Sequence, residues 1–242
     1  MDIGSAGFDP DENVTIWDKL YSVVDPLRNL HILKKEILYK PFNKSVEKSM
    51  PATNGNIPVA CMGKTLYFNN HGHIGDVLHD VFINEIYSRL NVNGRQVIDI
   101  GATVGDTAIY FCIRGARSVH AYECDKRYYS ELLKNVALNG LEKEITPHNT
   151  AVASLNGMRI EDGAVLKMDC EGCEYPVILG ARAGVLERFS EIMMEYHYGY
   201  LNLRKRLGDA GFKVTVTRPQ RSGVKGGMAG LLYATRNENR LQ

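Results

Sequence analysis

This chain of 242 residues has no long apolar stretch, no internal repeat and no low-complexity segment. Its apolar runs are only a few residues long, which excludes a bilayer-crossing helix of ~20 apolar residues. The N-terminus is acidic and lacks the apolar core of a secretory signal, so we expect a cytoplasmic protein with no membrane partner. The composition, 44% hydrophobic and 24% charged, is typical of a globular protein.

Cysteine is also sparse, with five residues in a chain too large to need disulfide staples. The number is odd, so we expect reduced thiols in a reducing compartment. Cys170 and Cys173 form a C-x-x-C pair. A zinc site needs about four ligands and usually a second such pair, which this sequence lacks. A redox-active pair remains the alternative.

A strong net charge is missing too, because 29 Lys and Arg face 28 Asp and Glu. The charge is uneven, however, since residues 201–242 hold nine bases and only two acids. Such a basic region can favour an anionic substrate or nucleic acid, although a solvated surface is the commoner explanation. A nucleic-acid-binding protein or RNA methyltransferase is therefore the alternative function.

The chain divides into an N-terminal segment, 1–74, and a larger domain, 75–242. Helical spacing of apolar residues over 14–39 predicts two helices broken at Pro26, and 57–68 reads as a hairpin around Met62–Lys64. We expect this segment to cover the substrate side. Asp76 predicts the N-cap of a helix that reaches Leu90. Histidines at 71 and 73 nearby suggest a polar loop more than a metal site.

Short apolar strands alternate with helices from residue 96 onward, which predicts a doubly wound, mostly parallel α/β sheet. The expected strands are 97–100, 118–123, 144–149, 165–169, 191–196, 212–217 and 229–235. The expected helices are 107–114, 126–138, one with Pro176 in its first turn, and 201–210. The last two strands have no helix between them, so the last of the seven should be antiparallel.

A glycine-containing loop leaves the first of these strands and enters a helix. It reads Asp99-Ile100-Gly101-Ala102-Thr103-Val104-Gly105-Asp106-Thr107. Its G-x-x-x-G spacing and flanking acids disfavour the pyrophosphate of NAD at a helix N-terminus. S-adenosylmethionine (SAM) carries an ammonium, a sulfonium and a carboxylate but no phosphate. Nearby acids can help to hold it, and backbone N–H groups of the loop can take its carboxylate.

Two further positions fit a nucleoside. Glu123 ends the second strand, 22 residues after Gly101, where a carboxylate can accept hydrogen bonds from both ribose hydroxyls. Asn149 and Thr150 follow the third strand and should meet the adenine. The alternative is a tight strand-to-helix turn with Glu123 on the surface.

Acids and a histidine follow the fourth and fifth strands, whose ends should be neighbours. Asp169, Glu171, Glu195 and His197 can ring one pocket and remove a proton from an acceptor as a methyl group arrives. The ring would also suit a hard divalent cation, but we assign none of these residues to a metal. Asp169 can instead cap a helix or contact the cofactor amine, and His197 can be a surface histidine. Glu174 reads as a helix-start residue.

These residues resemble the FkbM family of SAM-dependent methyltransferases, a class I family, over about residues 75–235. The resemblance is carried by DVFINEIY (80–87), VIDIGATVGDTAIYF (97–111), GARSVHAYE (115–123), NVALNG (135–140), LKMDCEGCEYPVI (166–178) and EIMMEYHY (191–198). It departs from the family in a short crossover, 154–163, and in Cys124-Asp125 where a proline is frequent.

The resemblance implies SAM contacts from Asp99, Gly101, Gly105, Asp106, Thr107 and Glu123. It also implies methylation of a hydroxyl, often on a sugar or other small molecule. Together with the residues above, it predicts a SAM-dependent methyltransferase, and we expect the methyl acceptor to be an oxygen.

Overall fold

The computed structural model describes residues 55–70, 74–221 and 228–236. The helices expected within 14–39, and the cover they were to form over the substrate side, lie outside these residues. Among the described residues, no helix combines the length and hydrophobicity that crossing a bilayer requires.

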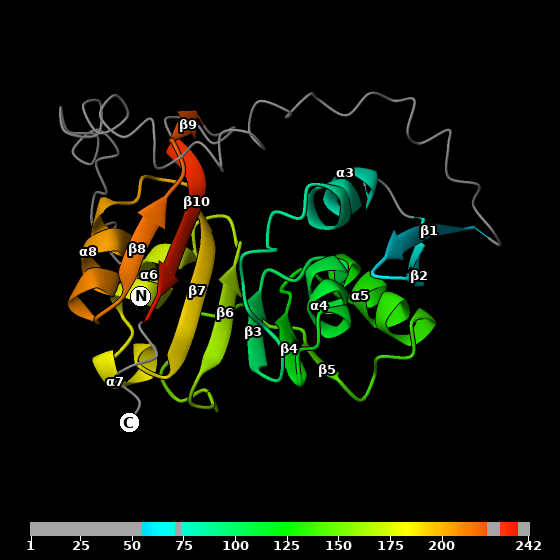
Figure 1. Cartoon of the computed structure of the whole chain (residues 1–242), viewed down its shortest axis with the longest axis horizontal. Coiled ribbons are helices and arrows are strands. Elements are labelled where there is room, and N and C mark those ends of the chain that lie inside the picture. The colour runs from blue at the N-terminus through cyan, green and yellow to red at the C-terminus, as the bar shows by residue number, and fades with distance from the viewer. Residues whose placement is uncertain (1–54, 71–73, 222–227, 237–242) are drawn as a thin grey trace, which may run out of the picture.

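A mostly parallel sheet forms the centre of the molecule (Figure 1). Its strands are β3 (Gln96–Ile100), β4 (Ser118–Tyr122), β5 (Ile145–His148), β6 (Ala164–Met168), β7 (Phe189–Tyr196), β8 (Lys213–Val216), β9 (Gln220–Arg221) and β10 (Met228–Thr235). Seven of them follow the order β5-β4-β3-β6-β7-β10-β8, and β9 pairs with β10. The structure confirms the doubly wound, seven-stranded sheet with an antiparallel last strand. That strand, β10, lies between β7 and β8 and is antiparallel to both.

Helices cover both faces of the sheet, because neighbouring residues of each strand point to opposite sides. The helices are α4 (Asp106–Ile113), α5 (Lys126–Leu138), α6 (Glu174–Leu179), α7 (Ala183–Leu186) and α8 (Leu201–Asp209). Val97 and Val165 pack with α4 and α5, whereas Ile98 and Leu166 pack with α6, α7 and α8. The bounds of α5 match the sequence prediction, and α7 is a short helix that the sequence did not predict.

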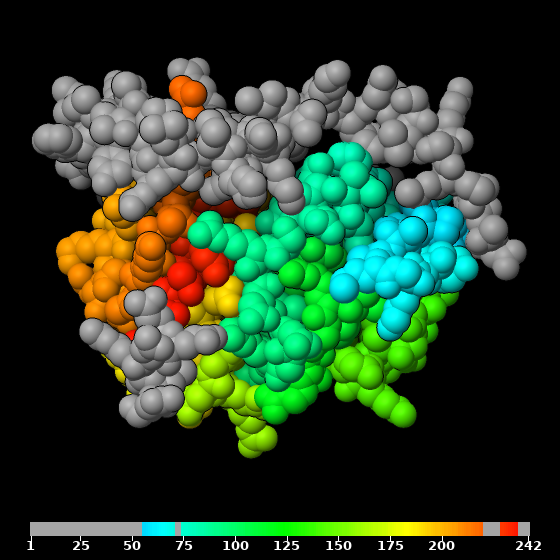
Figure 2. Space-filling view, in the orientation of Figure 1, coloured from blue at the N-terminus to red at the C-terminus, as the bar shows by residue number. Residues whose placement is uncertain are grey.

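A hairpin of β1 (Asn56–Cys61) and β2 (Lys64–Asn69) lies against α5, as Figures 1 and 2 show. Met62 and Gly63 have φ of 47° and 76°, as a two-residue hairpin turn requires. Asn69 donates its backbone N–H to Asn135 and its side-chain amide to Glu131, at 2.8 and 2.6 Å. The hairpin expected at 57–68 is confirmed. It shares a core with the domain expected to begin at residue 75.

The helix expected from Asp76 to Leu90 is wrong in its bounds. The chain forms α3 (Ile74–Leu78), continues as a π-helix, η1 (His79–Ile83), and then turns back. Asp76 lies inside α3 and does not cap it. The helix ends because Glu85 adopts a φ of 48° and the Asn84 side chain bonds to Asp80 at 2.8 Å.

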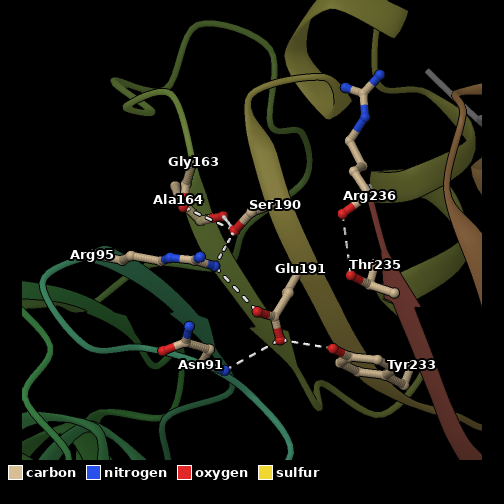
Figure 3. Close-up of polar contacts among 9 residues, drawn as sticks. All are labelled: Asn91, Arg95, Gly163, Ala164, Ser190, Glu191, Tyr233, Thr235 and Arg236. Carbon is tan, nitrogen blue, oxygen red and sulfur yellow. Dashed lines mark hydrogen bonds and ion pairs between the residues drawn. The ribbon is translucent and has the colours of Figure 1, made fainter. Parts of the chain in front are cut away.

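A partly buried network ties the segment before β3 to β7 and β10 (Figure 3). Glu191, near the start of β7, accepts bonds from Arg95, the Asn91 backbone and Tyr233 at 3.1, 3.2 and 2.8 Å. Arg95 also donates to Ser190 at 2.8 Å. This network lies at the amino end of β7, so it supports the sheet at the end away from the candidate site.

Candidate functional site

The candidate site lies where the strand order reverses. From β3 the chain moves outward through β4 and β5, then returns to place β6 on the other side of β3. Ile100 at the end of β3 is aligned with both Tyr122 of β4 and Met168 of β6. Ligands of open α/β sheets bind in the crevice outside the carboxyl ends of the strands at such a point.

Gly101 lets the loop after β3 lie directly against the end of β6. Its φ is 77°, and a Cβ at this position would lie 1.7 Å from the carbonyl oxygen of Asp169. A larger residue would therefore push the two strand ends apart. Gly105 has a φ of 85°, and a Cβ at this position would lie 3.1 Å from Cγ of Leu132 in α5.

The loop N–H groups are largely used inside the protein. Gly101 and Ala102 both donate to the carbonyl of Tyr122, at 2.9 and 3.0 Å, and Gly105 donates back to Ala102 at 2.7 Å. Ala102 and Gly105 are buried, whereas Gly101 keeps some exposed surface. Each of these three N–H groups already has an acceptor in the protein, and their bonds to a carboxylate of the cofactor stay a prediction.

Asp99 and Thr107, both expected to contact the cofactor, lie beneath the loop. Asp99 is fully buried and accepts a bond from Thr107 Oγ1 at 2.6 Å. Its other oxygen is 3.1 Å from Nζ of Lys167, which also donates to the carbonyl of Gly101 at 2.8 Å. Both side chains thus support the loop, and their contact with the cofactor stays a prediction. Lys167 was missed, although a lysine within the apolar strand VLKM is a visible signal.

Asp106 is a better candidate for cofactor contact. It begins α4 and is 2% exposed, and its Oδ1 has no hydrogen-bond partner among the residues that the structure describes. Burial raises its pKa to about 7, although the charge of Lys167 acts in the opposite direction. A buried carboxyl oxygen without a donor is costly, and a cationic ligand group would satisfy it.

Glu123 follows β4 at the edge of the crevice and is 7% exposed, so it is not the surface residue of the alternative prediction. Its Oε2 accepts the Thr103 N–H at 3.0 Å and its Oε1 accepts the Asp125 N–H at 2.7 Å. Each carboxylate oxygen can accept a second bond, so capacity remains for two hydroxyl donors. Asn149, exposed beside it, donates to the Glu123 carbonyl at 2.9 Å, and Thr150 is exposed next to Asn149.

The structure brings together three residues that the sequence placed in one ring. Asp169, Glu195 and His197 each offer an atom within 4.8 Å of the others. The reason is the parallel pairing of β6 and β7, which aligns Met168 with Met194. Burial raises the pKa of Glu195 to about 7, and the charge of Asp169 adds to this effect. Glu195 can thus lose and regain a proton near neutral pH.

His197 is held between two carboxylates. Its Nδ1 is 3.2 Å from Glu174 Oε1, and its Nε2 is 3.3 Å from Glu171 Oε2. The hydrogen bond to Glu174 raises the pKa of His197 to about 9. A raised pKa favours the protonated imidazole at neutral pH, and the role of His197 as a base stays a prediction. At 4% exposed it is not a surface histidine either.

Glu174 was expected only to start a helix. It does begin α6, but its side chain is fully buried and reaches His197. The sequence pattern did not reveal this contact, because it joins the first residue of α6 to the residue that follows β7. The same trio, Asp169, Glu195 and His197, has metal-ligand spacing. A metal ion would have to displace the proton of the imidazole, because a histidine binds a metal in its neutral form.

A disulfide joins Cys170 and Cys173. The expectation of reduced thiols is therefore wrong for this pair, and Cys61, Cys112 and Cys124 are free. The turn between β6 and α6 brings the two Cα atoms to 5.5 Å, within the range that a disulfide needs. The chain length and the number of cysteines do not reveal that Cys170 and Cys173 lie close together, although the C-x-x-C spacing allows a disulfide between them.

Comparison with known proteins gives weak relationships. No family model matches the sequence. An uncharacterized protein of Sulfolobus islandicus rod-shaped virus 1 is 28% identical over 88 residues, which cover 36% of this chain and 54% of that protein. An uncharacterized protein of a Sulfolobus islandicus filamentous virus is 30% identical over 93 residues, which cover 36% of this chain and 52% of that protein. The chain thus spans about half the length of the curated relatives it matches.

Three of the similar solved structures are methyltransferases. The tRNA m1G37 methyltransferase of M. jannaschii is 16% identical, with a TM-score of 0.48, over 76% of this chain and 58% of its own. The magnesium protoporphyrin IX methyltransferase of Synechocystis PCC 6803 with bound SAH is 16% identical, with a TM-score of 0.48, over 70% and 89%. A ribosomal protein L11 methylase of Lactobacillus delbrueckii is 19% identical, with a TM-score of 0.46, over 70% and 84%. Likeness at this level does not reveal the activity of this chain.

Proposed function

We propose that this chain is a SAM-dependent methyltransferase of the FkbM type that methylates a hydroxyl of a sugar or another small molecule. The observation that carries the proposal is the ring of carboxylates around the glycine loop at the switch point. Glu123 and Asp169 follow the ends of β4 and β6 and border that loop, and Asp106 begins the helix that the loop enters. Such a crevice suits a cationic nucleoside and repels a pyrophosphate.

The residues present fit SAM at two points. Glu123 has free acceptor capacity for the two ribose hydroxyls, because in the described part of the chain a single backbone N–H reaches each of its oxygens. Asp106 has a buried oxygen without a donor, which an ammonium group would satisfy. When bound, SAM supplies an activated methyl group on its sulfonium. Lys167 pairs with Asp99 and donates to the Gly101 carbonyl, so the backbone of the loop is held in place before the ligand binds.

On the acceptor side, Glu195 is the base we propose. Its pKa of about 7 allows it to take a proton from a hydroxyl at physiological pH. The nearby His197 cation lowers the pKa of Glu195 and so favours its ionised form. Glu171 and Glu174 keep His197 charged and in place.

Calorimetry on the full chain with SAM, SAH and NAD tests this proposal. We expect SAM and SAH to bind and NAD not to bind, because the carboxylates oppose its pyrophosphate. Asp106→Asn should weaken SAM binding, whereas Glu142→Gln, an exposed position on the loop after α5, should not. Binding of NAD without SAM would refute the assignment. RNA binding that persists near physiological salt would favour the nucleic-acid alternative.

A further inference from the structure

The turn that carries the Cys170–Cys173 disulfide lies directly on the acceptor side of the site. It follows Asp169 and leads into α6 at Glu174. Glu171, within the turn, has a φ of 57°, a backbone conformation that residues other than glycine rarely adopt. A cross-link between the residues on either side limits the ways in which this turn can relax. The disulfide therefore helps to hold Glu171 in an unfavourable conformation.

Of the two carboxylates that hold His197, Glu171 lies in this turn and Glu174 is the first residue of α6 behind it. Glu171 Oε2 is 3.3 Å from Nε2, and Glu174 Oε1 is 3.2 Å from Nδ1. The same Glu174 oxygen accepts the backbone N–H of Cys170 at 3.1 Å and lies 3.6 Å from its sulfur. One buried oxygen thus links the disulfide to the histidine.

We propose that Cys170 and Cys173 form a reversible redox site that controls how firmly the turn holds His197, with a dithiol reductant as its reaction partner. A thiolate of the reductant attacks one cysteine sulfur, the S–S bond breaks, and the other sulfur leaves with the electron pair and takes a proton. The second thiol of the reductant then displaces the first cysteine, which also takes a proton. The products are two cysteine thiols and the disulfide of the reductant. The exchange runs backward with an oxidised dithiol.

Reduction changes the surroundings of His197 in two ways. The Cys170 sulfur, which carries no hydrogen in the disulfide, becomes a thiol donor 3.6 Å from Glu174 Oε1 and competes with Nδ1 for it. The freed turn also lets Glu171 leave its left-handed conformation and draw its carboxylate away from Nε2. Both cysteines are partly exposed, so a reductant can reach them. The influence on methyl transfer rests on the proposed function, whereas the exchange itself does not.

The test uses the full chain before and after dithiothreitol, with thiols counted by alkylation and mass spectrometry. We expect three alkylated cysteines before reduction, matching Cys61, Cys112 and Cys124, and five after it. The pKa of His197, followed by NMR with His197→Gln to assign its signal, should fall from about 9 toward its ordinary 6.5. The control Cys61→Ser should respond to reduction as the unaltered chain does.

Two results would overturn the redox site. One is five alkylated cysteines even after treatment with oxidised dithiothreitol. The other is a His197 titration that reduction leaves unchanged while circular dichroism shows a folded chain. The double variant Cys170→Ser/Cys173→Ser should titrate as the reduced chain does, and reduction of the unaltered chain decides the matter if that variant fails to fold. Calorimetry with SAM keeps the two proposals apart, since absent SAM binding refutes the methyltransferase and leaves the titration result standing.

Discussion

Replacing Glu123 by alanine is the sharpest test of the cofactor site. Its two oxygens each have room for one more donor, so we expect a hydrogen bond to each ribose hydroxyl. A hydrogen bond to a charged group contributes roughly 1.5–3 kcal/mol, so losing two should weaken SAM binding by at least ~3 kcal/mol, or ~100-fold. The same change leaves the N–H groups of Thr103 and Asp125 without acceptors, which should lower the free energy of unfolding by about 1–3 kcal/mol for each group that stays buried.

The measurement is calorimetric titration of each purified variant with SAM, beside urea unfolding. Glu123→Gln keeps the volume and one oxygen, so its affinity should fall between those of alanine and the unaltered chain. Glu142→Gln alters an exposed glutamate and should leave both quantities unchanged. If the alanine variant is folded and binds SAM within twofold of the unaltered chain, the ribose lies elsewhere and the argument from Glu123 fails.

Two further predictions concern the groups below and beside the cofactor. Lys167→Met leaves the Asp99 carboxylate buried without its counter-charge, so the free energy of unfolding should fall by about 3–5 kcal/mol. Adding Asp99→Asn should restore part of this free energy. Urea unfolding measures both changes, and a loss under ~1 kcal/mol in Lys167→Met would contradict the prediction. Because the pKa of Glu195 is raised to about 7, its carboxylate is protonated below that pH and ionised above it, so turnover of an identified acceptor should rise about tenfold from pH 6 to pH 8. Glu195→Gln should lower turnover and flatten that limb of the pH profile, and an unaltered profile in this variant would exclude Glu195 as the base.

The sequence predicted the parts of this molecule that depend on local pattern and on sheet topology. The end of the helix Lys126–Leu138 follows from the Asn139-Gly140 pair behind it, and the parallel alternation follows from short apolar strands. The meeting of Asp169 with Glu195 follows as well, because the ends of adjacent parallel strands lie at one edge of a sheet.

The parts that the sequence could not predict depend on contacts between distant residues. Asp99 looked like a ligand of the cofactor, because nothing local reveals that Lys167 lies on the neighbouring strand to pair with it. Nothing local reveals either that the Glu174 carboxylate lies against Nδ1 of His197. The helix expected to reach Leu90 ended early, since the bond from Asn84 to Asp80 competes with the helical pattern.

The position of β10 inside the sheet has a consequence for how the chain is made. A ribosome releases β7 and β8 before β10, yet in the described part of the chain β8 pairs only with β10. Until β10 arrives, β7 is an open edge and β8 has no strand beside it. Open edges invite pairing with other chains, and domains whose closing contacts are far apart in sequence fold slowly. The sheet is thus exposed to aggregation during synthesis until residues 228–235 have been added.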